Sequence, residues 1–303
     1  MVEKTLVIAH GDLDGIATAA ITKHNVENAN VELISVGRFP DCLEQKIGKR
    51  YRRLIVADLC PNPSQTNRVI RALKNISKET EVLWFDHHLW PSKTINEVLA
   101  TGAKLVLDTE RVAAEIALDE IGDHAREIER RLAEIARDAD LLLNEDTLAV
   151  KWRRLLHWNR GRWRLKYMAL NAFIEGVLWP DWAEKTYRTV EKLYRRELRQ
   201  AHTSTLVTYT SGIRVAFTTA DERLDPGDVQ LMLRDKGFRA EVYVILHRNS
   251  VSLRSKHIDV SRIARILGGG GHKWSAGAPL RGDSGEKIRA VISAIEKALV
   301  REV

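Results

Sequence analysis

The chain has 303 residues, a formal net charge of +7 and only two cysteines. This length allows one large or two medium domains, and the positive charge favours an anionic partner, although charge of this size also serves solubility. Two cysteines without a Cys-x-x-Cys pair exclude a disulfide framework and a cysteine-based zinc site. We expect a cytoplasmic protein, because the amino terminus lacks a signal-peptide pattern and no stretch is apolar enough to span a membrane.

The first half of the chain alternates short apolar runs with amphipathic stretches. The pattern predicts strands at residues 5–9, 31–36, 52–59, 81–85 and 104–107, and helices at 16–23, 64–75, 111–121 and 126–143. Strands and helices that alternate in this way are typical of a parallel sheet covered on both faces. The predicted fold class is therefore α/β.

Three of these predicted strands end in acids and imidazoles. The first runs into His10-Gly11-Asp12-Leu13-Asp14-Gly15, the third ends at Asp58, and the fourth ends at Asp86-His87-His88. The carboxyl ends of parallel strands meet at one edge of a sheet, which is where open α/β sheets bind ligands. Crowded carboxylates repel one another, and a cation between them relieves the repulsion. A helix cap at Asp14 is the simpler alternative for the first motif.

Two more acids, Asp138 and Asp140, lie among apolar residues near the end of the helix predicted at 126–143. They indicate either a solvated helix end or a further ligand. With one of them, the acids and histidines at the strand ends exceed the needs of one tetrahedral zinc and suit two divalent ions, with manganese the natural choice for nitrogen and oxygen donors. Two such ions can share an acid, lower the pKa of a bridging water and neutralise phosphoryl oxygens, which predicts phosphoester hydrolysis.

The segment 151–200 is rich in tryptophan and cations, with five tryptophans among arginines and lysines before a basic helix predicted at 184–200. Aromatic side chains among cations can stack bases in a single-stranded channel. Alternatively, the indoles pack helices together while the cations remain in water. The sequence leaves both interpretations open for this segment.

The remainder of the chain has the pattern of a second, smaller α/β domain. Strands are predicted at 205–210, 213–218, 240–246 and 251–254, with Ser211-Gly212 as a hairpin turn, and helices at 226–236, 259–267 and 285–300. Glycines 268–271 precede His272, and glycine allows backbone N–H groups to approach an anion closely. We interpret this run as a phosphate or nucleotide cradle, with Arg254 on a neighbouring strand as a further donor. The predicted domains are 1–150, a helical connector at 151–203, and 204–303.

Four of these features together resemble the DHH phosphoesterase family with an attached DHHA1 domain. They are the His10–Gly15 motif, the strand-end Asp58, the Asp86-His87-His88 triplet and the Gly-Gly-Gly-Gly-His run. The likeness covers most of the chain except the tryptophan-rich middle. It implies an amino-terminal parallel-sheet DHH domain, a helical linker and a smaller α/β DHHA1 domain.

The resemblance also implies the roles of individual residues. It assigns two Mn²⁺ ions, with Mg²⁺ or Co²⁺ as alternatives, to His10, Asp12, Asp14, Asp58, His87 and one further acid. We choose Asp138 for that acid, with Asp140 as its rival. The resemblance further implies that Asp58 bridges the two ions, that Asp86 orients the histidines and that His88 faces the scissile phosphate. It assigns substrate binding to Arg254, Gly269, Gly270, Gly271 and His272.

The expected function is hydrolysis of short single-stranded RNA, or short single-stranded DNA, to mononucleotides. One alternative is a phosphodiesterase for cyclic dinucleotides or for the linear dinucleotide pApA. An alternative of another class is an accessory protein that binds single-stranded nucleic acid and has an inactive site. We expect nucleotides or oligonucleotides as ligands and no membrane partner, and the sequence leaves a homodimer open.

Overall fold

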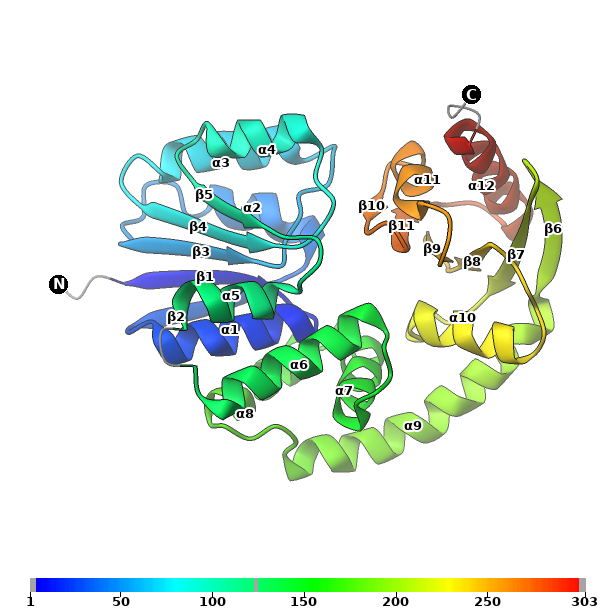
Figure 1. Cartoon of the computed structure of the whole chain (residues 1–303), viewed down its shortest axis with the longest axis horizontal. Coiled ribbons are helices and arrows are strands. Elements are labelled where there is room, and N and C mark those ends of the chain that lie inside the picture. The colour runs from blue at the N-terminus through cyan, green and yellow to red at the C-terminus, as the bar shows by residue number, and fades with distance from the viewer. Residues whose placement is uncertain (1–3, 123–124, 300–303) are drawn as a thin grey trace. The chain divides into compact units, whose positions relative to one another are not determined.

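The computed structural model describes residues 4–122 and 125–299, which form two compact units (Figure 1). The first unit ends at Tyr187 and the second begins at Arg188. Within the described residues, no helix is both long enough and apolar enough to cross a membrane.

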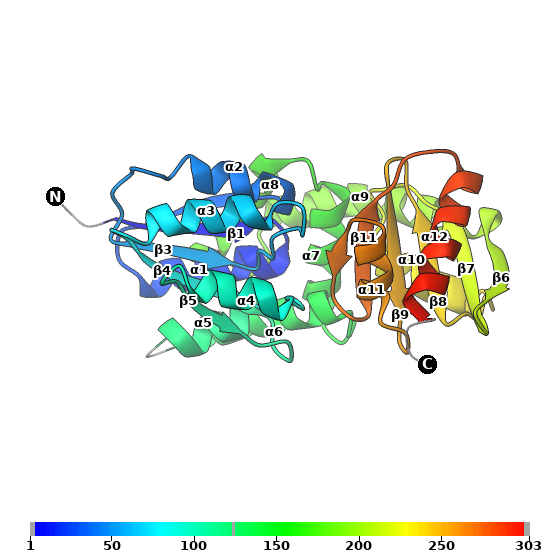
Figure 2. The same cartoon turned by 90° about the horizontal axis from the view of Figure 1, so that it is seen from above.

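The first unit contains a five-stranded sheet in the order β2-β1-β3-β4-β5, and each neighbouring pair is parallel. Its strands are β1 (Thr5–His10), β2 (Ala29–Ile34), β3 (Arg53–Ala57), β4 (Glu81–Asp86) and β5 (Lys104–Leu107). The strands run side by side in both views (Figures 1 and 2). The parallel α/β sheet predicted from the sequence is confirmed.

Helices cover both faces of this sheet (Figure 1). One face carries α1 (Leu13–Asn25) and α5 (Ala113–Ile121), and the other carries α2 (Phe39–Glu44), α3 (Thr66–Ile76) and α4 (Ser92–Leu99). On the second face, Trp84 packs edge-on against Phe39 and Trp90, with ring centroids 5.3 and 4.9 Å away. Burial on both faces explains why the central strands have continuous apolar runs.

Four helices follow the sheet: α6 (Glu127–Leu141), α7 (Thr147–Trp158), α8 (Trp163–Ile174) and α9 (Asp181–Ala201). Both α6 and α8 contact α1. The domain boundary expected at residues 150–151 falls inside α7, whose first turn is capped by the Asp146 carboxylate. The predicted connector therefore begins within a continuous helix.

Part of the tryptophan-rich segment is a packed aromatic cluster. Trp152 is fully buried, and its ring centroid lies 5.2 Å from Phe173, 4.8 Å from Trp179 and 5.9 Å from Trp182. Its indole N–H donates to the carbonyl of Leu178 at 2.8 Å. For this cluster the packing alternative is correct, because a ring enclosed in this way is inaccessible to a base.

The second unit contains a six-stranded sheet in the order β10-β11-β9-β8-β7-β6, in which only β7 and β8 pair in parallel. Its strands are β6 (Leu206–Thr210), β7 (Ile213–Thr219), β8 (Val242–Leu246), β9 (Ser250–Ser255), β10 (Gly270–Gly271) and β11 (Ser275–Pro279). Its helices are α10 (Pro226–Asp235), α11 (Val260–Ile266) and α12 (Ser284–Leu299). Figure 1 shows α11 and α12 on one face of the sheet and α10 on the other.

The predicted hairpin in this unit is present. Ser211 and Gly212 have φ angles of 48° and 78°, and Thr210 pairs with Ile213 across the two-residue turn. Positive φ at both central positions matches the twist of the flanking strands. The smaller α/β domain predicted from the sequence is confirmed.

Short elements account for most differences from the prediction. The second strand lies at Ala29–Ile34 instead of 31–36, and α2 and α4 were not predicted. With six and eight residues, these helices are too short to show a clear helical period.

Candidate metal centre

The first strand and helix position three candidate ligands within five residues. His10 is the last residue of β1, Asp12 caps α1 and accepts a hydrogen bond from the Gly15 N–H at 3.1 Å, and Asp14 lies in the first turn of α1. A Cβ atom on Gly15 would lie 2.2 Å from the His10 carbonyl oxygen. Glycine is therefore required here, because any side chain would force the strand end and the helix start apart.

His10, Asp12 and Asp58 form one group of donors, whose ligand atoms lie within 4.8 Å of one another. The Nδ1 atom of His10 is 2.8 Å from Asp12 and 3.4 Å from Asp58. Burial alone would lower the pKa of His10, but the carboxylates of Asp12 and then Asp58 raise it well above its ordinary value. The electrostatic field at this group therefore attracts positive charge.

Asp14, Asp58 and His87 form a second group with ligand atoms within 4.8 Å of one another. The Nε2 atom of His87 lies 3.4 Å from Asp58 and 3.6 Å from Asp14. Burial raises the pKa of Asp14 well above its ordinary value, and the neighbouring Asp58 carboxylate adds to the shift. Burial alone would lower the pKa of His87, but the surrounding carboxylates raise it to about 11.

The carboxylate of Asp14 is held in place by the start of α5. It accepts hydrogen bonds from the backbone N–H groups of Ala113 and Ala114 at 2.8 and 2.9 Å. The amino terminus of a helix favours a carboxylate in this position. Sequence reasoning missed this contact, because alanine N–H groups in a distant part of the chain give no sequence signal.

Asp58 belongs to both of these groups and to a third, which it forms with Asp86 and His88. It is 2% exposed and has a φ of 54°, a left-handed conformation that aspartate tolerates better than most residues. Its backbone N–H donates to the carbonyl of Phe85 at 2.9 Å, which ties the end of β3 to β4. Its Oδ2 atom is buried and makes no hydrogen bond within residues 4–122 and 125–299. A buried carboxylate oxygen in this state is suited to a cation.

Asp86 makes internal hydrogen bonds with both of its carboxylate oxygens. Its Oδ1 accepts from the His87 N–H at 2.8 Å and lies 2.6 Å from His88 Nδ1, while its Oδ2 accepts from the Trp90 indole at 2.7 Å. Burial alone would raise the pKa of Asp86, but the imidazole of His88 lowers it to about 2. These contacts orient the triplet, and the Trp90 contact was not foreseen.

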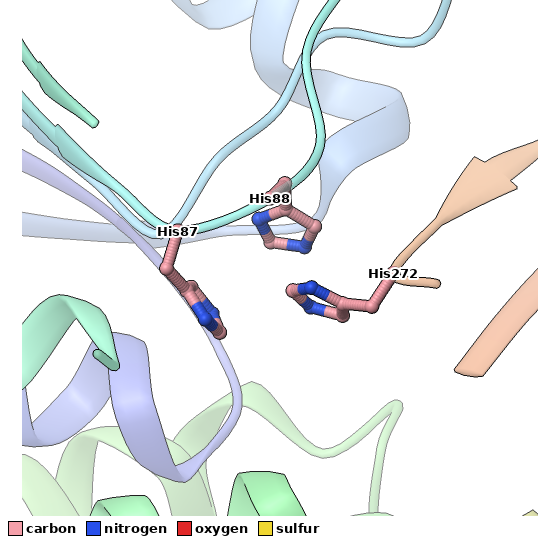
Figure 3. A group of neighbouring side chains, drawn as sticks. All are labelled: His87, His88 and His272. Carbon is pink, nitrogen blue, oxygen red and sulfur yellow. The ribbon is translucent and has the colours of Figure 1, made fainter. Parts of the chain in front are cut away.

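The two imidazoles of the triplet lie side by side after β4 (Figure 3), with ring centroids 5.0 Å apart. His87 is 3% exposed and belongs to the second donor group, whereas His88 is half-buried. Burial alone would lower the pKa of His88, but Asp86 raises it. The two histidines therefore occupy different environments although they are adjacent in sequence.

The structure does not bring Asp138 to the donor groups. Its carboxylate accepts hydrogen bonds from the backbone N–H groups of residues 144, 145 and 146 at 3.2, 2.8 and 2.8 Å, where it fixes the turn after α6. Its rival Asp140 lies 3.9 Å from His87 Nε2. Burial raises the pKa of Asp140, and the nearby Asp58 and Asp12 carboxylates add to this shift. This placement is a correction: Asp140 is the acid beside the cluster.

The candidate substrate residues of the second unit lie on neighbouring strands. Arg254 on β9 pairs with Ser275 on β11, and β11 in turn pairs with the glycine strand β10; His272 follows β10 (Figure 3). A Cβ atom on Gly269 would lie 2.0 Å from a backbone oxygen of β11, and one on Gly271 would lie 2.7 Å from β11 backbone. Close packing of the chain thus explains two of the glycines, while Gly270 has open space at the same position.

The residues present fit a pair of divalent cations. Within the described part of the first unit, three donor groups of carboxylate and imidazole share Asp58, and Asp140 lies near His87 at their margin. In the third group, both carboxylate oxygens of Asp86 already accept hydrogen bonds, so the first two groups are the better candidates for the ions. Nitrogen and oxygen donors of this kind suit Mn²⁺ or Mg²⁺. Without a cation, several acids would be buried close together, which raises the pKa of Asp14 and Asp140.

Comparisons with known proteins agree with this architecture. No protein-family model matches the sequence, and no curated protein matches it. Among solved structures, the chain is similar to the DHH domain of a protein described as a member of a ribosomal-protein family. The two are 15% identical with a TM-score of 0.64, and the match covers 97% of this chain and 87% of that chain.

Two further structures are similar over nearly all of this chain. RecJ from Thermus thermophilus in complex with Mn²⁺ is 15% identical with a TM-score of 0.59, covering 99% of this chain and 52% of that chain. The pGpG-specific phosphodiesterase PggH from Vibrio cholerae is 13% identical with a TM-score of 0.57, covering 98% of this chain and 100% of that chain. The chain therefore has the fold of the DHH proteins.

Proposed function

We propose that this protein is a two-metal phosphodiesterase that hydrolyses short single-stranded oligonucleotides, RNA and DNA, to mononucleotides. The observation that carries the proposal is the pair of donor groups that share Asp58 at the carboxyl edge of the first sheet. Two divalent ions bound there would lower the pKa of a bridging water and neutralise phosphoryl oxygens during displacement.

Each side chain of the cluster has a distinct proposed role. His10 and Asp12 would hold one ion, Asp14 and His87 would hold the other with help from Asp140, and Asp58 would be available to both. These assignments follow the donor groups and their distances.

Asp86 and His88 act beside the ions. Asp86 fixes the Nδ1 side of the His88 ring at 2.6 Å and raises its pKa against the effect of burial. We assign His88 to the scissile phosphate, where its ring would face a phosphoryl oxygen. Mutating Asp86 should weaken the contact of His88 with the phosphate, because the His88 ring would lose its orientation.

A nucleotide substrate is supported by the second unit and by the similar structures. Arg254, the backbone of Gly269–Gly271 and His272 are assigned to the end of the oligonucleotide, and the net charge of +7 suits a polyanion. RecJ is described as an exonuclease bound to manganese, and PggH as a phosphodiesterase for pGpG. The manganese in two RecJ structures supports Mn²⁺ as the cofactor, and the donor set of this chain also suits Mg²⁺.

A linear dinucleotide is the second candidate substrate. The alignment with PggH covers 98% of this chain and all of that protein, so the two folds match from end to end. A panel of RNA and DNA oligonucleotides from dinucleotides upward, with cyclic dinucleotides alongside, distinguishes the candidates. A rate that is highest for the dinucleotide and falls steeply with length would favour the second candidate.

The test of the proposed function is a timed digest of an end-labelled RNA five-mer with Mn²⁺. The wild-type protein should release mononucleotides, and Asp58→Asn should reduce the rate by about a thousand-fold or more, since both ions lose a ligand. Asp119→Asn, a change at an exposed surface acid on α5, is the matched control and should cleave normally. Near-normal cleavage by Asp58→Asn in saturating Mn²⁺ would refute the proposal, and salt-sensitive binding without any product would indicate an accessory binding protein instead.

A further inference from the structure

Two side chains of α8 pack directly on the loop between β1 and α1. A Cβ atom on Gly11 would lie 2.7 Å from a ring carbon of Trp163 and 2.9 Å from the Nζ atom of Lys166. Gly11 separates His10 from Asp12, so α8 places an indole and an ammonium beside the first donor group. Glycine permits this close approach because it has no side chain.

Lys166 is a buried cation that the proposed roles leave unused. It is 7% exposed, its Nζ atom lies 4.5 Å from the centroid of the Trp163 ring, and it makes no hydrogen bond or ion pair with the residues that the structure describes. Burial lowers its pKa, and the Asp12 carboxylate opposes that shift. Most of this side chain is buried and its ammonium lies against the Trp163 ring, so an anion such as a phosphoryl group would be a strong hydrogen-bonding partner for it.

Trp163 also lines a cavity of about 300 Å³ at the carboxyl end of β2. The other lining residues come from β2, α2 and the turns around them: Glu32, Leu33, Ile34, Ser35, Arg38, Cys42 and Gln45. The Gly11 N–H donates to the carbonyl of Ile34 at 3.0 Å. The loop between β1 and α1 therefore carries His10 and Asp12 of the first donor group and also contacts the wall of the cavity.

The chemistry of this cavity fits a flat heteroaromatic ring. Half of its lining residues are apolar, the Trp163 indole among them, and half are polar, so it offers both a stacking surface and groups that can orient a ligand. Its charges are mixed: Glu32 is paired with Lys46 at 2.5 Å, and Arg38 is the single lining cation among the described residues. A second phosphate would require a more positive lining, whereas the polar edge of a nucleobase matches amide, hydroxyl and guanidinium groups.

We propose that Trp163 and this cavity form a nucleobase subsite, and that Lys166 binds the phosphate of the same nucleotide beside the metal centre. The inference rests on the proposed function and deepens it, because it makes the first unit itself a reader of the base. Stacking on an aromatic ring contributes to the binding of every base, so the subsite would accept all four.

The test compares the binding of AMP with that of ribose 5-phosphate, which has the phosphate and sugar but no base, by calorimetry on the full chain with Mn²⁺. Wild-type protein should prefer AMP by about ten-fold or more, the effect of one stacked base. In Trp163→Ala the affinity ratio of AMP to ribose 5-phosphate should fall close to one, while Trp163→Phe should retain most of the preference for AMP. Lys166→Met should weaken both ligands.

Tyr209→Ala is the control, because Tyr209 is an aromatic residue with 72% exposure on β6, at the opposite edge of its sheet from the glycine strand β10. It should leave the ratio unchanged. The subsite would be overturned if Trp163→Ala left the affinity ratio of AMP to ribose 5-phosphate unchanged, or if Tyr209→Ala lowered this ratio as much as Trp163→Ala does. It would also be overturned if the wild type bound both ligands equally well. Cleavage of the RNA five-mer, measured on the same preparations, separates the two proposals: intact cleavage without base preference overturns only the subsite, and base preference without cleavage overturns only the proposed function.

Discussion

Replacing Asp58 by asparagine should abolish most of the stabilisation that Mn²⁺ gives to the folded protein. Asparagine is the appropriate substitution because it keeps the volume of the side chain and tolerates the φ of 54° at this position. It removes the charge that both donor groups share. One change therefore weakens two ion sites.

The size of the effect follows from binding linkage. An ion present at about a hundred times its Kd stabilises the folded state by about 2.7 kcal/mol. In a unit of this size, about 1 kcal/mol shifts Tm by about 2–4 °C, so each ion should raise Tm by about 5–11 °C. If each site in Asp58→Asn binds Mn²⁺ about a hundred-fold more weakly, the same Mn²⁺ concentration stabilises the folded state by only about 0.4 kcal/mol per ion. Each ion should then raise Tm by only about 1–2 °C.

The assay is thermal unfolding monitored by circular dichroism. Each protein is measured once with EDTA and once with Mn²⁺ at a concentration that saturates the wild type. Asp138→Asn is the control, since the Asp138 carboxylate accepts three backbone hydrogen bonds away from the donor groups. This variant should lower the free energy of unfolding by about 1–3 kcal/mol, and hence Tm, both with EDTA and with Mn²⁺. The shift in Tm that Mn²⁺ causes should stay the same as in the wild type. A metal-induced shift in Asp58→Asn equal to that of the wild type would refute the shared-ligand geometry.

Three further outcomes are expected. Asp140→Asn should reduce the affinity for Mn²⁺ in calorimetry, and an affinity equal to the wild type would exclude this acid from the cluster. His10 and Asp14 have raised pKa values in the metal-free protein, so they retain protons that Mn²⁺ must displace. The affinity for Mn²⁺ should therefore increase with pH, and the measured binding enthalpy should depend on the ionisation enthalpy of the buffer. Identical binding enthalpies in two buffers with different ionisation enthalpies would contradict this. Gly15→Ala should lower Tm strongly, since its Cβ would lie 2.2 Å from the His10 carbonyl oxygen, whereas Gly161→Ala, with open space around it, should change Tm little; equal effects would contradict the proposed close packing.

The strand ends of the first sheet were predictable because local patterns encode them. Apolar runs that end in His10, Asp58 and Asp86 are each readable in a short window, and parallel strands place their carboxyl ends at one edge. The parallel sheet and its carboxyl edge therefore follow from periodicity and from the rules of strand connection.

Features that depend on packing between distant segments were not predictable. Asp138 and Asp140 are close neighbours on α6, and which of them faces the cluster depends on how α6 packs on α1 and α5. Similarly, the sequence singled out a tryptophan-rich segment but could not separate Trp152, which is enclosed by other rings, from Trp163, which lines a cavity. Such distinctions arise from tertiary contacts and not from the local pattern.

The most direct test of the central claim is anomalous diffraction at the manganese edge from crystals soaked in Mn²⁺. Two peaks should appear on either side of the Asp58 carboxylate, one beside His10 and Asp12 and the other beside Asp14 and His87. A map without ion density at these positions, or with both ions bound elsewhere, would contradict the proposed two-metal centre.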